Sequence, residues 1–334
     1  MIELYPRSIH DRYIKKICGS KSGVDAVCQE IKKACEGVGT NETKLIELLG
    51  PRSLEDRTMI ACRYKDLFKV DLHDLIAEET SGDFGFLLQL LCYPLPQAEA
   101  FAIKEALAGF GTKEDILIPI LMGRTNDEML ILKQAYFDMY QEDLGVAIAG
   151  DLSNDFEKIM KTVVQANVQQ YDASIHTQAR AEADAKRLFD AGEGRLGTDE
   201  SPFYKILLTS PPEHLMKINE VYKSGKSKDL VAAIDSEFSN YEKDALIFHV
   251  RSALNALDLI CDHFHSSMAG FGTKEYILSC DIIRYQGAFT RIAQHYQQKY
   301  KAILKKRILE ETSAEYQKLL ESILNAPASQ ASGA

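Results

Sequence analysis

Four short turns in this sequence combine glycine, threonine and an acid in nearly the same order. The hexapeptide GVGTNE at residues 37–42 returns as GFGTKE at 109–114, as RLGTDE at 195–200 and as GFGTKE at 270–275. The spacing of the copies divides the chain into four units of similar length. A turn that bends around two glycines can aim several carbonyl oxygens at one point, because no β-carbon blocks the approach.

Each turn is matched by a carboxylate further along the chain, at Glu79, Asp151, Glu237 and Glu311. Counted from the first residue of the hexapeptide, the separation is identical in the first three units and one residue shorter in the fourth. In units one, two and four the acid begins a similar stretch: Thr or Leu, Ser, a small or turn residue, an acid and an aromatic residue. Unit three departs from this pattern after Glu237, so Asp235 is an alternative acid there.

Carbonyls together with one carboxylate make a binding site built only from oxygen. Ca²⁺ accepts six to eight oxygen ligands in flexible geometry, whereas Mg²⁺ prefers a tight octahedron and keeps its waters. Three carbonyls and a bidentate carboxylate would supply about five ligands and leave about two positions open. The pattern therefore favours calcium, with room for an incoming phosphate oxygen.

Two other interpretations of the turns remain open. In the purely structural one, glycine ends one helix and threonine caps the next, a role open to Thr40, Thr112, Thr198 and Thr273. In the other, the turn binds an anion at a helix N-terminus. The P-loop pattern fails, however, because Glu220 stands where its glycine is required. A carboxylate paired with every turn also disfavours a phosphate unless a cation lies between them.

The elements that position these turns are predicted to be helices. Apolar residues at helical spacing precede the first turn, as in Val24, Val27 and Ile31, and follow it, as in Leu45 and Leu48. Similar stretches elsewhere give about five helices per unit and almost no strand pattern, which predicts an all-α protein of stacked helical units. The longer gap between the second and third turns contains VQANVQQYDASIHTQA, which we interpret as a linker between two halves.

Composition narrows the range of partners. The 334 residues carry a net charge of -10, and the one basic block is Lys305, Lys306 and Arg307. Unaided binding to nucleic acid or to an anionic membrane is disfavoured, so an anionic partner would need a bridging cation. No run approaches the roughly 18 apolar residues of a membrane span, and no secretory signal begins the chain, which predicts a cytoplasmic protein. The seven cysteines, an odd number without a C-x-x-C pair, are interpreted as reduced, mostly buried residues.

The turns, the matched acids and the pairs Arg52-Ser53 and Arg124-Thr125 resemble the repeats of the annexin family. The resemblance covers about residues 20–325 and implies four annexin-type repeats of five helices each, in a curved two-plus-two disc. It also implies calcium-dependent, reversible peripheral binding of acidic phospholipid membranes, with Ca²⁺ bridging interhelical loops to lipid phosphates. The implied bounds are a short N-terminal segment 1–19, repeats 20–93, 94–168, 181–254 and 255–325, a linker 169–180 and a tail 326–334.

The resemblance implies which atoms would hold the calcium ions. Three loop carbonyls would join the matched carboxylate in the first, second and fourth repeats. Arg195 replaces the first glycine of the third turn and Pro202 follows closely, so only Gly197 and Glu237 are assigned there. The implied ligands are Cys35, Gly37, Gly39 and Glu79; Leu107, Gly109, Gly111 and Asp151; Gly197 and Glu237; and Met268, Gly270, Gly272 and Glu311.

The cysteine-rich, divergent repeats are also similar to the protozoan annexins called alpha-giardins, which are linked to membranes and the microtubule cytoskeleton. This similarity favours a second hypothesis, a calcium-regulated structural adaptor associated with microtubules or other cytoskeleton. Weak homo-oligomers on membranes are a further expectation, and a nucleic-acid partner is not expected. Enzymatic activity is not predicted, because His263 and His265 would point about 200° apart on a helix, one packed and one solvated.

Overall fold

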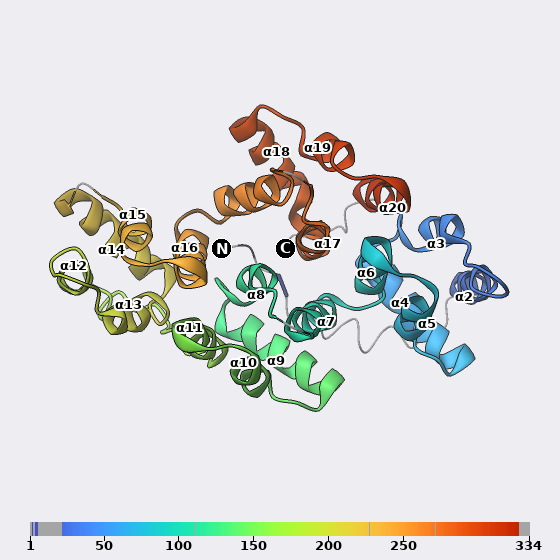
Figure 1. Ribbon diagram of the computed structural model, residues 1–334, viewed down its shortest axis with the longest axis horizontal. Coiled ribbons are helices and arrows are strands. Elements are labelled where there is room, and N and C mark those ends of the chain that lie inside the picture. The colour runs from blue at the N-terminus through green and yellow to red at the C-terminus, as the bar shows by residue number, and fades with distance from the viewer. Residues whose placement is uncertain are drawn as a thin grey trace. The chain divides into compact units, whose positions relative to one another are not determined.

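The computed structural model describes residues 2, 4–5, 22–109, 111–226, 228–270 and 272–326. Over these residues the chain forms helices and no strand (Figure 1), which confirms the all-α prediction. The predicted N-terminal segment is described at three residues, and residues 327–334 of the predicted tail lie outside the described part. No helix within these ranges combines the length and the apolar character that crossing a bilayer requires.

The helices follow the predicted count of five per repeat. The first repeat contains α2 (Ser22–Ala34), α3 (Glu42–Leu49), α4 (Leu54–Phe68), α5 (Leu72–Glu79) and α6 (Gly82–Leu91). The second contains α7 (Leu95–Leu107), α8 (Glu114–Leu121), α9 (Asn126–Tyr140), α10 (Leu144–Asp151) and α11 (Asn154–Val164). The third contains α12 (Gln178–Ala191), α13 (Glu200–Leu207), α14 (Pro212–Lys226), α15 (Leu230–Glu237) and the start of α16 (Asn240–Ser267). The fourth contains the end of α16, then α17 (Glu275–Arg284), the short η1 (Gln286–Ala288), α18 (Phe289–Tyr300), α19 (Leu304–Glu310) and α20 (Ala314–Asn325).

Helix α16 serves two repeats. Asn255 interrupts it with φ -157° and ψ 82°, which is not helical geometry. The interruption lies next to the predicted boundary between the third and fourth repeats at residue 254. Two helices joined at this kink therefore supply the last helix of one repeat and the first helix of the next.

The chain divides into two compact units, which do not correspond to its two halves. The continuous unit is Ile103–Leu259, and the two-segment unit is Ile2–Ala102 together with Ile260–Ala334. The second and third repeats thus share one unit, and the first and fourth share the other. The polar stretch interpreted as a linker between halves instead runs inside the continuous unit, so that interpretation is wrong. Composition could not reveal this, because pairing of repeats depends on which helix faces fit together.

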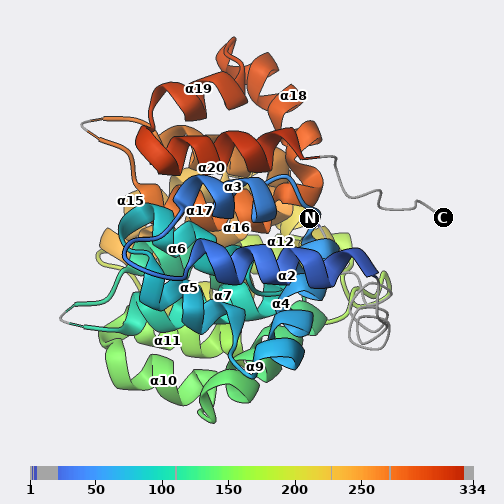
Figure 2. The same cartoon turned by 90° about the vertical axis from the view of Figure 1, so that its right-hand side faces the viewer.

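Within the two-segment unit, α6 is apolar on almost every side and is correspondingly buried. It packs against α5, α17 and α20, and α20 also lies along α3 (Figure 1, Figure 2). Gly50, at the end of α3, allows this approach, because a β-carbon there would lie 2.4 Å from Ser322 Oγ. The core of this unit is therefore made jointly by the first and fourth repeats.

Within the continuous unit, α12 packs against α13 and α14, and α8 packs against α11. Gly123, just after α8, lies against α16, where a β-carbon on it would be 2.4 Å from Ser252 Oγ. The same contact joins Gly50 and Ser322 in the two-segment unit. Each unit therefore uses a glycine after the second helix of one repeat to seat the fifth helix of its companion repeat.

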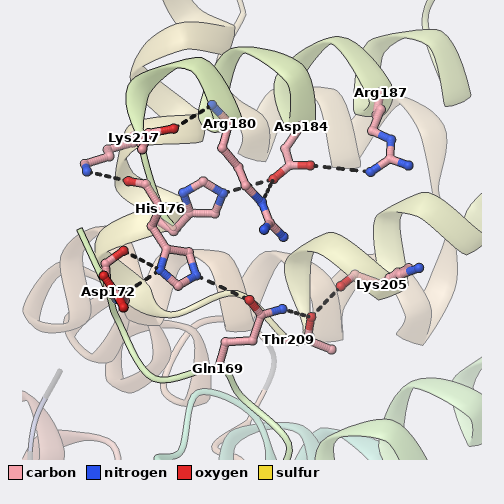
Figure 3. A network of polar contacts seen from close by, with 11 residues as sticks. Gln169, Asp172, His176, Arg180, Asp184, Arg187, Lys205, Thr209 and Lys217 are labelled. Atoms are coloured by element: carbon pink, nitrogen blue, oxygen red, sulfur yellow. Dashed lines mark hydrogen bonds and ion pairs between the residues drawn. The ribbon is translucent and has the colours of Figure 1, made fainter. Parts of the chain in front are cut away.

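The polar stretch before α12 is fixed by hydrogen bonds. Its backbone at Val168 exchanges two hydrogen bonds with the Asn126 side chain, at 2.8 and 3.0 Å. Figure 3 shows the imidazole of His176 between Asp172 and Gln169, and Lys217 Nζ donates to the His176 carbonyl at 2.7 Å. The connection between the second and third repeats is thus held against both of them.

Buried charge lies beside this connection. His214 is 1% exposed, and its Nε2 is 3.0 Å from Asp184 Oδ2. Arg180 and Arg187 also lie beside the Asp184 carboxylate (Figure 3). Burial lowers the pKa of His214, against the opposing pull of Asp184. His214 is therefore a neutral hydrogen-bonding partner at neutral pH, and it would resist protonation on acidification.

Candidate functional site

The structure joins each hexapeptide to its matched acid through the threonine hydroxyl. Thr40 Oγ1 lies 3.0 Å from the Glu79 carbonyl, and Thr273 Oγ1 lies 2.8 Å from the Glu311 carbonyl. The corresponding distance is 3.4 Å from Thr112 to Asp151 and from Thr198 to Glu237. All four turns are therefore held beside the predicted acids, although each pair is separated by 38 or 39 residues in sequence.

Threonine does not cap the following helix, so the capping role allowed by the sequence is wrong. The helices begin one residue later than that role requires. Asn41 caps α3 by accepting from the Lys44 amide at 3.0 Å, and Asp199 caps α13 by accepting from the Ser201 amide at 3.3 Å. The hydroxyl is thereby free to tie two distant turns together. The sequence signal for this hydrogen bond between the turn and the matched acid is the threonine that recurs in every hexapeptide.

Paired glycines shape the turns of the first, second and fourth repeats. Gly37 and Gly39 have φ angles of 105° and 83°, in the region that side chains disfavour. The equivalent pairs, Gly109 with Gly111 and Gly270 with Gly272, have φ between 89° and 100°. A backbone hydrogen bond closes each turn, as from the Asn41 amide to the Ala34 carbonyl at 2.8 Å.

The predicted carbonyl ligands are not used to close these turns. In the described part of the chain, no backbone amide donates to the carbonyls assigned in the first, second and fourth repeats. A β-carbon added at either glycine of each pair would meet no atom within 4 Å, so these turns stand clear of the protein. The carbonyls assigned are those of Cys35, Gly37, Gly39, Leu107, Gly109, Gly111, Met268, Gly270 and Gly272.

The third turn is built differently. Only Gly197 takes a positive φ there, at 77°, and Arg195 does not. The closing hydrogen bond runs from the Asp199 amide to the Ala191 carbonyl, so this turn is one residue longer than the others. Its carboxylate is nevertheless in place: Thr198 Oγ1 donates to Glu237 Oε2 at 2.7 Å, and a β-carbon on Gly192 would lie 2.9 Å from Glu237 Cγ.

The four acids occupy equivalent positions. Glu79, Asp151 and Glu237 are the last residues of α5, α10 and α15, and Glu311 directly follows α19. Three residues after each acid, the chain takes a positive φ between 52° and 62°, at Gly82, Asn154, Asn240 and Ala314. The backbone of unit three therefore follows the same course after Glu237 as in the other units, although its residue types differ there. Asp235 instead points to Lys243, at 3.2 Å, so Glu237 is the acid that faces the turn.

The turns that follow Asp151 in the second repeat and Glu237 in the third both line one groove in the continuous unit. Its lining includes Asp151 and Asn154 from one turn, and Asn240 and Glu242 from the other. Burial, reinforced by the negative charges of Asp155 and Glu200, raises the pKa of Glu242. The groove therefore has several carboxyl groups in or beside it, and Lys158, which pairs with Asp155 at 2.6 Å, partly offsets their charge.

The donor set of each turn fits Ca²⁺ better than a transition metal. It consists of carbonyl oxygens and one carboxylate, which are hard ligands. Burial, with a smaller contribution from Glu79, raises the pKa of the Cys35 thiol to about 11, so this sulfur stays protonated. Among the described residues, no cluster of three or more His, Cys, Asp or Glu side chains could hold a metal ion. Any ion at these turns would therefore depend on backbone oxygens.

The hydrogen bond between the threonine of each turn and its matched acid, the threonine tie, leads to a first prediction. Thr40→Val removes the hydroxyl while keeping the shape of the side chain, and we expect it to weaken calcium binding at the first turn by about three- to tenfold, because a typical hydrogen bond contributes ~1 kcal/mol. Hydrogen exchange of residues 35–42 during a calcium titration measures this. Thr162→Val is the matched control, since Thr162 bonds only to Lys158 within its own helix. Equal midpoints for Thr40→Val and the wild type would contradict the prediction.

The two histidines for which no enzymatic role is predicted pack against neighbouring side chains, and most of the described cysteines are buried. His263 Nδ1 lies 2.7 Å from Asp281 Oδ2, and His265 stacks on Tyr300 with ring centroids 4.0 Å apart. Both are partly buried, so the expectation of one packed and one solvated histidine is wrong; each packs on a different neighbour. Four of the six described cysteines are buried, as expected: Cys28, Cys35, Cys92 and Cys261.

Comparison with known proteins gives a consistent result. The profile of the Annexin family matches residues 26–91, 97–163 and 183–248. The chain is 33% identical over 317 residues to annexin A13 of Homo sapiens, covering 94% of this chain and 99% of that protein.

Solved structures agree in fold. A variant of annexin A8 matches with a TM-score of 0.84 and 31% identity, over 92% of this chain and 96% of that one. Calcium-bound annexin (Sm)1 matches with a TM-score of 0.72 and 28% identity, over 92% of each chain. Calcium-bound alpha-14 giardin matches with a TM-score of 0.73 over 91% of this chain and 100% of that one, and its 19% identity shows the fold alone.

Proposed function

Because this chain belongs to the annexin family, whose members in general bind phospholipids in a calcium-dependent manner, we propose that it attaches reversibly to acidic phospholipid membranes through Ca²⁺ held at its interhelical turns. Calcium would supply the positive charge that draws together the oxygens of a turn and of a lipid phosphate. The observation that carries the proposal is the threonine tie. It brings a carbonyl-rich turn and a carboxylate to one place in all four repeats.

We propose that the ions are held by the carbonyls of the paired-glycine turns and by Glu79, Asp151 and Glu311. Gly197 and Glu237 form a fourth, less complete site, because the third turn lacks the first positive-φ glycine. Four ions would add about +8 to a chain whose net charge is -10, which nearly removes the repulsion from an anionic surface. Membrane attachment should therefore require calcium.

The tips of two turns support contact with a membrane surface. Val38 lies between the two glycines of the first turn, Leu196 directly precedes Gly197 in the third, and both are fully exposed, at 108% and 102%. An apolar side chain presented in this way can enter the boundary between headgroups and acyl chains. In the two-segment unit, the α2–α3 and α16–α17 connections project on the same side (Figure 2). Two ions on one side would reinforce each other, because the first contact raises the effective concentration of the second.

Cosedimentation with vesicles tests the proposal. We expect the protein to pellet with vesicles that contain phosphatidylserine when calcium is present, and to stay in the supernatant when a chelator is added. Vesicles of phosphatidylcholine alone are the control for surface charge. Equal pelleting in calcium and in chelator would refute a calcium-dependent attachment.

The cytoskeletal adaptor, the cytoplasmic location, homo-oligomers on membranes and the repeat bounds stay predictions. Pelleting with microtubules or filamentous actin in the absence of lipid would favour the adaptor. We propose a cytoplasmic protein that associates peripherally with membranes when calcium rises.

A further inference from the structure

The fourth site differs from the first and third in what holds its carboxylate. Thr40 and Thr198 donate hydrogen bonds to the carboxylates of Glu79 and Glu237. Glu311 instead forms an ion pair with Arg307, whose Nη2 lies 3.0 Å from Glu311 Oε1. Among the described contacts, Thr273 bonds to the Glu311 backbone carbonyl, as Thr112 does to that of Asp151. The carboxylate predicted to bind calcium in the fourth repeat is thus already paired with a cationic side chain.

This arrangement follows from one position in the sequence. Arg307 is in the last turn of α19, and Glu311 caps that helix four residues later, so both side chains lie on the same side. The positions four residues before the other acids are uncharged: Leu75, Ala147 and Ala233. Among the described residues, Glu311 is the matched acid that forms an ion pair, whereas Lys228, which acts electrostatically on Glu237, pairs with Glu193.

Arg307 is held where a calcium ion would have to compete with it. The Arg307 side chain is 40% exposed and that of Glu311 is 30% exposed, so the pair is partly shielded from water. The neighbouring Lys306 points elsewhere, to Glu310 at 3.6 Å.

A guanidinium cannot yield its place by losing a proton, because arginine stays charged in proteins. For Ca²⁺ to use both oxygens of Glu311, the guanidinium must move away from Oε1 and would still repel the incoming ion. We propose, on the basis of the calcium-binding function proposed above, that Arg307 is a built-in competitor for the fourth site and makes it bind calcium more weakly than its turn geometry alone would allow.

Calorimetric titration with calcium, in the absence of lipid, tests this inference on the full chain. The background is Glu79→Gln, Asp151→Asn and Glu237→Gln, which leaves Glu311 as the only matched acid. We expect Arg307→Gln in this background to tighten the dissociation constant by about two- to fivefold, as expected for loss of a partly exposed ion pair. Lys306→Gln makes the same change in net charge and should alter the constant less than about twofold. Arg307→Lys keeps the charge and should leave binding weak.

The outcomes separate this inference from the proposed function. Equal dissociation constants for the background protein and Arg307→Gln would overturn the competitor role, and so would an absence of calcium binding in both. The proposed function would still stand in either case if the wild type pellets with phosphatidylserine vesicles only in calcium. Thermal unfolding provides a second readout: a lower melting temperature in Arg307→Gln without tighter binding would show a merely structural ion pair.

Discussion

The variant that combines Glu79→Gln, Asp151→Asn and Glu311→Gln is expected to lose calcium-dependent pelleting with phosphatidylserine vesicles. Each amide keeps the shape of the carboxylate but removes the charge and the bidentate oxygen pair that Ca²⁺ requires. Each single variant should still pellet and need only a modestly higher calcium concentration, because several weak sites act together. For the triple variant we expect no pelleting at calcium concentrations up to about ten times those that the wild type needs.

A matched control separates ligand loss from a change in net charge. The control combines Glu78→Gln, Asp138→Asn and Glu310→Gln, which remove the same number of charges. Glu78 and Glu310 directly precede two of the matched acids, and Asp138 lies in α9. We expect this control to pellet like the wild type. If the triple variant of the matched acids binds vesicles with an unchanged calcium requirement, these carboxylates do not control attachment.

Acidification is expected to destabilise the continuous unit through His249. Burial lowers the pKa of His249 to about 4, against about 6.5 in an unfolded chain. The unfolded state therefore binds the proton first, so stability is complete above pH 6.5 and falls as the pH drops toward 4. The loss should approach about 3 kcal/mol at pH 4 and about 2 kcal/mol at pH 5. Urea unfolding at a series of pH values measures it.

The variant His249→Gln checks the assignment. It removes the titrating ring from beside the Gly123 amide, which lies 3.4 Å from His249 Nδ1. We expect this variant to be less stable at pH 7 and to have a flatter stability profile between pH 7 and 5. His214 should contribute a remaining slope of the same sign, because its pKa is also lowered. A profile as steep as that of the wild type would assign the acid sensitivity to other groups.

Much of the fold could be predicted because it repeats. Four copies of one hexapeptide, each followed by an acid at nearly the same separation, identified the repeats and the turns that their helices hold. Helical spacing of apolar residues gave the all-α class. Glu237 also lies beside its turn as expected, although the residues after it differ from those in the other repeats. Local signals were sufficient for these features because each lies within one repeat.

Other features depend on contacts that no local pattern reports. Pairing of the first repeat with the fourth rests on fits such as Gly50 against Ser322, whose residues are far apart in sequence. The sequence predicts that Thr40 caps the following helix, because a threonine directly before a helix is often its N-cap, and this prediction is wrong. Asn41, one residue later, caps the helix instead. Only the three-dimensional position of Glu79 shows which group accepts the hydrogen bond from the Thr40 hydroxyl.

The division into a continuous and a two-segment unit has a consequence for synthesis of the protein. The continuous unit can fold as soon as the ribosome has released residue 259, whereas α6 must wait for α17 and α20 to cover it. The whole continuous unit is made between α6, which ends at Leu91, and α20, which ends at Asn325, and at roughly 5–20 residues per second the wait lasts about 12 to 47 seconds. During that time a helix with Phe84, Phe86 and Leu88 on its surface needs protection from aggregation. The nascent chain is therefore expected to depend on chaperones most strongly while its second and third repeats are being made.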